Sequence, residues 1–148
     1  MEFNLVIQSN LWRGDELAWE DILSLAIRHS GERQGDSEKS IALVLTDDAQ
    51  IQAYNRDFRG KDKPTNVLSF PSDEPDEWGD IMLAHETIAR EAVGQGKTFR
   101  NHATHLLVHG MLHLMGYDHE NEQEASEMES LETTILSQLS IADPYEND

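Results

Sequence analysis

Three histidines spaced four and six residues apart are the part of this sequence best suited to chemistry. His109 and His113 would lie on one face of a helix, one turn apart. His119 comes six residues later, about 9 Å along a continuous helix, which is too far for it to join them. Gly116 removes this difficulty, because glycine readily adopts the left-handed conformation that ends a helix and reverses the chain. The spacing predicts three imidazoles around one point with a fourth position open to water, as in a catalytic zinc site.

Chance and ordinary packing offer another interpretation of these histidines. A single histidine on an apolar helix face is more often a structural residue than a ligand. The chain has seven histidines and no cysteine, so thiolate ligands are excluded and some pairs at helical spacing are expected. The pair followed by a glycine and a third histidine is much harder to obtain by chance. We therefore expect one Zn²⁺ per chain, held by His109, His113 and His119. His102 and His105 are interpreted as surface residues or as neighbours that support the ligands.

The histidine pattern is close to H-E-x-x-H-x-x-G-x-x-H, the signature of the metzincin proteases. The departure is Gly110, which stands where a protease has its general-base glutamate and has no side chain to move a proton. Metal-assisted hydrolysis of another kind remains, because zinc lowers the pKa of bound water towards ~7. Asp118 is the nearest carboxylate in the sequence. It could be the base, it could orient a ligand histidine, or it could be an exposed turn residue with neither role.

A basic loop stands out in a strongly acidic chain. The net charge is −18, from 29 acidic and 11 basic residues, which argues against a general nucleic-acid binder. Four of the basic residues nevertheless fall close together, at positions 56, 59, 61 and 63. This loop could admit a polyanion that the rest of the surface repels, or it could be a solvated loop without a ligand.

Arg59 is the candidate catalytic residue of this loop. A guanidinium binds a phosphate through two parallel hydrogen bonds and can stabilise the negative charge that develops when a phosphodiester is hydrolysed. Zinc-assisted attack by water with Arg59 at the phosphate would be a coherent phosphodiesterase site. The alternative is an arginine that merely closes the end of a helix.

The elements that must position these residues follow from the hydrophobic pattern. Thr98 is a suitable cap for a long helix that carries His109 and His113. The short connection between the third and fourth strands predicts an antiparallel pair, with one strand near the sheet edge. The fold class is α+β, a small four-stranded mixed sheet covered by about five helices with a zincin-like metal helix. Strands are expected at residues 3–8, 41–45, 67–70 and 80–84, and helices at 15–29, 48–58, 86–93, 99–115 and 120–139, with turn-like residues at 31–40 and a polar tail from 141.

Length and composition limit the remaining possibilities. At 148 residues the chain is expected to form a single domain over 1–148. The sequence lacks both an apolar run of the ~20 residues needed to cross a bilayer and a recognisable secretory signal. We therefore expect no membrane association, and cysteine usage is compatible with the cytoplasmic location that we predict.

Several blocks of the sequence resemble one known family. The block from His109 to His119, the block from Arg59 to Pro71 and the short Gly79-Asp80-Ile81 stand in the order and at the separation found in the bacterial YbeY family of endoribonucleases. The resemblance extends through the acidic helix to Asp143-Pro144-Tyr145, so it covers most of the chain from about residue 40. The histidine block is the most specific part.

This resemblance implies a metal-dependent, single-strand-specific endoribonuclease. The family acts in ribosomal RNA processing, notably at the 3′ end of the small-subunit RNA, and in ribosome quality control. The implied partners are ribosomal RNA, the small ribosomal subunit and a small-subunit ribosomal protein. Carried over by position, the three histidines would bind zinc and Arg59 would be the catalytic or RNA-contacting arginine.

Two other functions were weighed against the endoribonuclease. One is a zinc hydrolase of a peptide or small-molecule substrate, since proteases share the three-histidine pattern; Gly110 speaks against it. The other is a non-catalytic ribosome assembly factor with a structural metal. The open fourth ligand position and Arg59 speak against that function, though more weakly.

Overall fold

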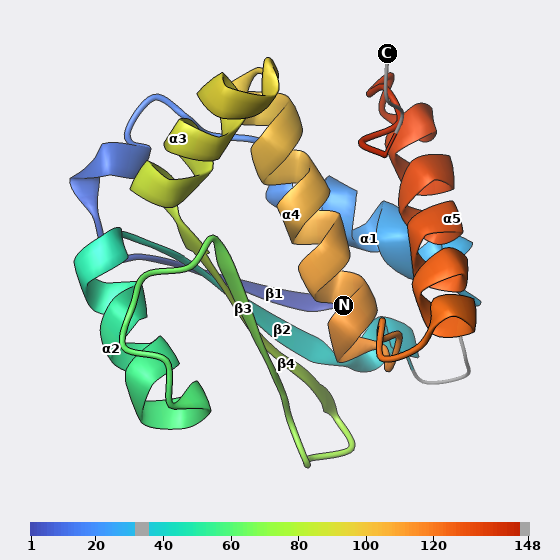
Figure 1. Cartoon of the computed structure of the whole chain (residues 1–148). Coiled ribbons are helices and arrows are strands. Elements are labelled where there is room, and N and C mark those ends of the chain that lie inside the picture. Colours follow the sequence, from blue (N-terminus) through green and yellow to red (C-terminus); the bar gives the residue numbers. More distant parts are fainter. Residues whose placement is uncertain (32–35, 146–148) are drawn as a thin grey trace.

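A four-stranded sheet lies at the centre of the structure, with the strand order β1-β2-β4-β3 (Figure 1). The computed structural model describes residues 1–31 and 36–145. Strands β1, β2 and β4 are parallel, and β3 pairs antiparallel with β4 at the sheet edge. This confirms the mixed sheet and the antiparallel edge pair. The strands are β1 (Glu2–Ile7), β2 (Ser40–Thr46), β3 (Val67–Pro71) and β4 (Glu77–Ala84).

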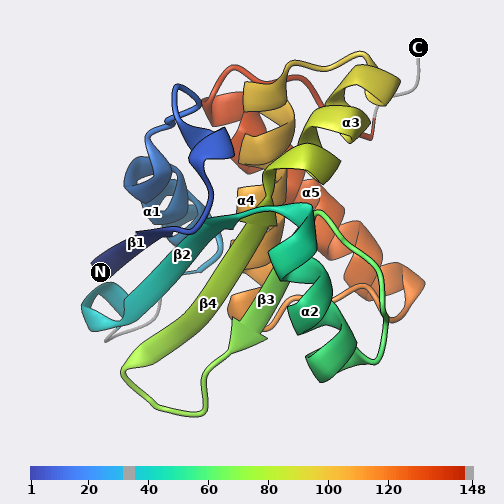
Figure 2. The same ribbon diagram turned by 90° about the vertical axis from the view of Figure 1, so that its left-hand side faces the viewer.

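Within the described residues, five α-helices pack around the sheet, most of them on one face, which confirms the predicted α+β class. Helices α1, α4 and α5 pack on one face, α3 lies at one end, and α2 is alone on the other face, beside β3 and β4 (Figures 1 and 2). The helices are α1 (Trp19–His29), α2 (Asp48–Arg59), α3 (His85–Gln95), α4 (Phe99–Leu114) and α5 (Glu122–Gln138), with 3-10 turns η1 (Asn10–Trp12) and η2 (Asp36–Glu38).

The core is divided by the sheet, because successive side chains of a strand point to opposite faces. In β2, Leu43 and Leu45 join the large cluster under α1, α4 and α5, whereas Val44 contacts the small cluster under α2. Helix α4 is buried on nearly every side, including His102 and Gly110, because α1, α3, α5 and the sheet all pack against it. A helix placed in this way holds its side chains rigidly, which suits a site built on it.

Both ends of α4 follow the sequence expectation. The Thr98 hydroxyl accepts a hydrogen bond from the Asn101 N–H at 3.1 Å and caps the first turn. The helix ends at Leu114, and the Gly116 N–H donates to the His113 carbonyl at 3.0 Å. Gly116 has φ = 101°, which the glycine can adopt without the strain a side chain would add. The chain therefore reverses where the third histidine requires it.

Two element boundaries differ from the prediction by three residues or more, and the others differ by at most two. Helix α1 begins at Trp19 instead of residue 15, because the Asp15 carboxylate bonds His85 Nε2 at 2.7 Å and is held outside the helix. Strand β4 begins at Glu77, three residues early, because Glu77 pairs with Ser40 of β2. Residues 32–35 of the expected turn and 146–148 of the tail lie outside the described residues.

Candidate metal centre

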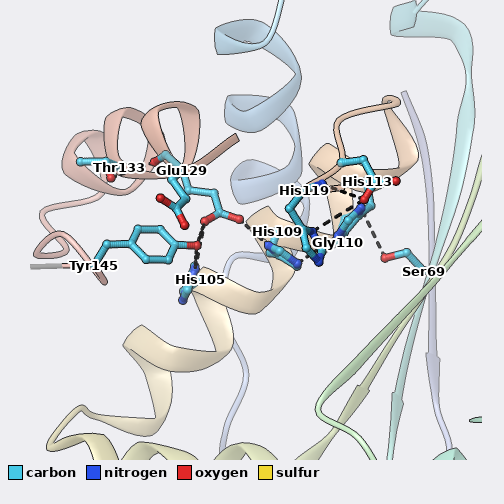
Figure 3. Close-up of polar contacts among 11 residues, drawn as sticks. Ser69, His105, His109, Gly110, His113, His119, Glu129, Thr133 and Tyr145 are labelled. Atoms are coloured by element: carbon cyan, nitrogen blue, oxygen red, sulfur yellow. Dashed lines mark hydrogen bonds and ion pairs between the residues drawn. The ribbon is translucent and has the colours of Figure 1, made fainter. Parts of the chain in front are cut away.

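The three predicted ligand histidines converge on one point. His109 and His113 lie one turn apart on α4, and His119 returns to them from the connection between α4 and α5 (Figure 3). One ring nitrogen from each residue lies within 4.8 Å of the other two, and His109 Nε2 is 3.0 Å from His113 Nε2. Tetrahedral ligands about 2.1 Å from zinc are roughly 3.4 Å apart, so small side-chain movements would suffice. The group can hold a metal ion, and nitrogen donors suit zinc.

Glu132 of α5 fixes the orientation of His109 through a hydrogen bond to the ring nitrogen that does not face the other two histidines. Its side chain is fully buried, and its carboxylate accepts a hydrogen bond from His109 Nδ1 at 2.5 Å. His105 Nε2 at 3.3 Å and the Tyr145 hydroxyl are its other partners. Because Nδ1 carries the proton in this bond, the Nε2 lone pair is directed towards the other two imidazoles. Tyr145 and His105 lie on the side of His109 away from His113 (Figure 3).

Glu132 keeps its charge in this buried position. Burial alone would raise its pKa, but hydrogen bonds from His105 and His109, the charge of His109 and the Tyr145 hydroxyl together lower it to about 2. An ionised carboxylate increases the basicity of the histidine that it contacts. The pKa of His113 is lowered by burial and then by the charges of His109 and His119, which favours the neutral ring that binds metal.

Sequence reasoning missed Glu132, although a signal was present. Helix α5 carries many acidic residues, and most of them face solvent. Glu132 instead follows Met128 by four residues and precedes Ile135 by three, so it occupies the apolar stripe of the helix. A lone acid on a buried stripe needs a partner. That requirement could have pointed to a histidine on the facing helix.

Arg59 and Asp118 line the same cavity as the three histidines. The cavity has a volume of about 450 Å³, and residues 65–69, leading into and along β3, form its opposite wall. Arg59 is exposed, ends α2 and lines this cavity. Asp118 Oδ1 accepts the His119 N–H at 2.7 Å and lies 3.7 Å from His119 Nδ1. The structure therefore brings all five predicted site residues together, while their roles stay predictions.

Gly110 has a packing role that the sequence pattern did not reveal. It faces the sheet, where a Cβ would lie 3.1 Å from both Ile81 Cγ2 and Ser69 Oγ. The Ser69 hydroxyl also donates to the Gly110 carbonyl at 3.3 Å. A side chain here would require Ile81 of β4 and Ser69 of β3 to shift by a few tenths of an ångström. The glycine thus allows the metal helix and the cavity wall to approach closely.

A mixed sheet beneath a buried helix, with a three-histidine cluster at the end of that helix, defines an α+β protein with a candidate metal centre. The family model described as Endoribonuclease YbeY matches residues 8–140. The chain belongs to this family. The fold and the family together confirm the resemblance inferred from the histidine block.

Individual relatives agree with this assignment. The Endoribonuclease YbeY of Chelativorans sp. is 54% identical over 118 residues, covering 75% of this chain and 72% of the relative. That of Bradyrhizobium sp. (strain BTAi1) is 48% identical, covering 95% and 90%. The solution structure of TM1509 from Thermotoga maritima shares the fold, with a TM-score of 0.58 and 22% identity over 98% of this chain and 99% of that one. Among the described residues, no helix combines the length and apolar character needed to cross a membrane.

Proposed function

We propose that this chain is a zinc-dependent, single-strand-specific endoribonuclease, working as one domain over residues 1–148. The proposed task is ribosomal RNA processing at the 3′ end of the small-subunit RNA, together with ribosome quality control. The observation that carries the proposal is the shared cavity, which is lined by both Arg59 and the three-histidine cluster. Membership in an endoribonuclease family supports RNA as the substrate.

The charged residues and the histidines of the candidate site have distinct parts in the proposed hydrolysis. Zinc held by the three histidines would act as a Lewis acid and make water a nucleophile near neutral pH. Arg59 binds the non-bridging phosphate oxygens and stabilises the charge that develops on them. Glu132 holds His109 in the tautomer that presents Nε2. Asp118, beside His119, is the carboxylate placed to take the proton of the attacking water or to orient His119.

The charge of the chain bears on how RNA reaches the cavity. A net charge of −18 repels a polyanion from most of the surface, so binding is confined to the side that carries Arg59 and the neighbouring lysines. We propose that the small ribosomal subunit, through one of its proteins, presents the RNA and supplies the missing affinity. This places the protein in the cytoplasm, with no membrane partner.

The test combines metal analysis with cleavage assays on single-stranded RNA and casein. Wild type should contain about one zinc per chain and cleave RNA. His113→Ala should lose both, and Arg59→Glu should keep the metal but lose cleavage. The matched controls are His29→Ala and Arg28→Glu, which change exposed residues of α1 and should match wild type.

Three outcomes would contradict the proposal. Casein cleavage that survives purification while RNA stays intact would identify a peptide hydrolase. RNA cleavage unaffected by His113→Ala would point to a contaminating nuclease. Full ribosome-processing function retained by Arg59→Glu would favour an assembly factor with a structural metal.

A further inference from the structure

Two aromatic side chains of α2 are exposed to solvent at the open side of the sheet. Tyr54 and Phe58 lie one helical turn apart and remain 37% and 69% exposed. Their rings are stacked, with centroids 6.2 Å apart and an interplanar angle of 12°, and the Phe58 ring also meets Phe70 of β3 edge-on at 5.4 Å. Exposed aromatic groups arranged in this way often mark a binding surface.

These rings form one wall of a slot with a volume of about 290 Å³. The residues that line the slot belong to α2, β2, β3 and β4, with Gln8 just after β1. Among the described residues, α2 is the helix that covers this face of the sheet, away from α4 (Figure 2). The half-buried Val44 and the buried Met82 give the slot an apolar lining, and the exposed Asp80 and Gln8 also line it. A flat aromatic ligand suits such walls. The carboxylate repels phosphate but accepts hydrogen bonds from base amino groups, so the slot favours a base over a backbone group.

The slot and the candidate metal centre are joined through α2 and β3. Phe58 borders the slot, and the next residue, Arg59, borders the cavity of the metal centre. On β3, Leu68 lines the metal-centre cavity and Phe70 lines the slot. The two openings therefore have adjacent lining residues on α2 and nearby lining residues on β3. A chain held at Arg59 is close to the slot, because Phe58 is the preceding residue.

The charge distribution favours nucleic acid as the occupant. Arg59, Lys61 and Lys63 are exposed at the end of α2 and in the loop that follows it, directly after Phe58 in the sequence. Cations that hold phosphates, next to an aromatic platform on which bases stack, are the usual arrangement for binding single-stranded nucleic acid. An apolar protein partner would use the slot but would have no need of these cations.

We propose that the slot lined by Tyr54, Phe58 and Phe70 binds a base of the single-stranded RNA substrate, close to the phosphodiester held at Arg59. The inference rests on the proposed function and adds a specific base-binding subsite to it. The base stacks on Phe58, its edge faces Asp80, and the phosphates between the slot and the metal centre lie near Lys61. The subsite explains how an acidic protein selects unpaired RNA, because a paired base cannot enter the slot.

The experiment measures binding of a 2′-O-methylated oligonucleotide of about ten residues to zinc-loaded protein, and a gel run after each titration verifies that the oligonucleotide is intact. Phe58→Ala should weaken binding about 5- to 150-fold, the range expected when one base stack is lost. Phe58→Trp should restore it, and the exposed indole should be quenched by the RNA, since Trp12, Trp19 and Trp78 are buried. The matched control is Val93→Ala, an apolar side chain on α3 that is 82% exposed.

Cleavage kinetics and abasic substrates locate the lost contact. With a long RNA, Phe58→Ala should raise KM and leave kcat nearly unchanged, as expected for a binding contact remote from the reacting atoms. One abasic position should weaken wild-type binding and leave Phe58→Ala binding unaffected. Thermal melting should be unchanged, because Phe58 is mostly exposed.

The outcomes separate this inference from the proposed function. If wild type neither binds nor cleaves RNA, the proposed function itself fails. If wild type cleaves RNA and Phe58→Ala behaves like Val93→Ala, the endoribonuclease stands and the base subsite is wrong. Loss of processing by Phe58→Ala on whole ribosomal subunits, with unchanged affinity for free RNA, would identify the slot as a protein-docking surface and overturn the inference.

Discussion

Replacing Glu132 with glutamine tests whether the buried carboxylate is part of the metal centre. The substitution keeps the size of the side chain and an acceptor oxygen for His109 Nδ1, and it removes only the charge. Of the three contacts that Glu132 makes, the one with His109, at 2.5 Å, is the one that reaches a candidate ligand. Its effect on metal affinity is therefore transmitted through one hydrogen bond.

The size of the effect follows from the strength of that bond. A hydrogen bond to a charged group contributes about 1.5–3 kcal/mol and a neutral one about 0.5–1.5 kcal/mol, so Glu132→Gln should lose roughly 1–1.5 kcal/mol of metal-binding free energy. This corresponds to about a tenfold weaker zinc affinity. Glu132→Ala removes the whole bond and should weaken affinity about 10- to 150-fold. Both values agree with the effects of outer carboxylates on other zinc sites.

A competition titration against a fluorescent zinc chelator measures this affinity directly. Glu91→Gln is a matched control, because Glu91 pairs at 2.9 Å with His102, another histidine of α4 that is not a candidate ligand. Its zinc affinity should stay within about twofold of wild type. Circular dichroism of the metal-free proteins checks that each variant folds. Equal affinity of wild type and Glu132→Ala, while His113→Ala abolishes binding, would refute the reasoning.

Three further substitutions test other parts of the structure. Arg59→Lys keeps the charge but loses the paired hydrogen bonds to phosphate, so kcat/KM on RNA should fall about 10- to 100-fold with zinc content unchanged; wild-type activity would refute a bidentate role. Gly79→Ala should lower the unfolding free energy by about 3 kcal/mol or more in urea titrations, because its φ is 130° and a Cβ would overlap the Phe70 carbonyl oxygen; an unchanged midpoint would show that the β3–β4 turn adapts freely. Burial raises the pKa of Asp48, but hydrogen bonds from Thr87 and Arg90 outweigh burial and lower it below 3.8. Its stabilisation is thus present above pH 3.8 and is lost as the pH falls through the lower folded value. The stability gap between wild type and Asp48→Asn, about 1–2 kcal/mol near pH 6, should therefore shrink in unfolding curves as the pH is lowered below 3.8; a constant gap would contradict this.

The metal helix was predictable because its signals are local. Thr98 and Gly116 mark its ends through their own backbone preferences, and the four-residue spacing of His109 and His113 is set by helix geometry alone. The return of His119 required only that the chain reverse at Gly116. Each of these inferences depends on neighbours within one or two turns, which a single sequence contains.

The remaining features depend on contacts between distant segments. Strand β4 begins before Trp78 because Glu77 pairs with Ser40 of β2. No local sequence pattern predicts this pairing. The approach of α4 to β3 made Gly110 a packing requirement as well as a missing base. The closeness of Arg59 to the histidines likewise comes from the position of α2 beside the edge strand. The sequence could identify Arg59 as a candidate phosphate-binding residue, but it could not predict that Arg59 lies beside the histidines.

The attachment of α5 to α4 through Glu132 makes the metal centre dependent on local unfolding. Helix α5 packs on the core through Met128, Ile135 and Leu136, and its buried carboxylate joins His109. If α5 opens as a unit, His109 loses the partner that selects its tautomer, even while α4 stays folded. The fraction of molecules ready to bind metal is then set by the opening free energy of α5. Amide hydrogen exchange along this helix should measure that opening free energy residue by residue.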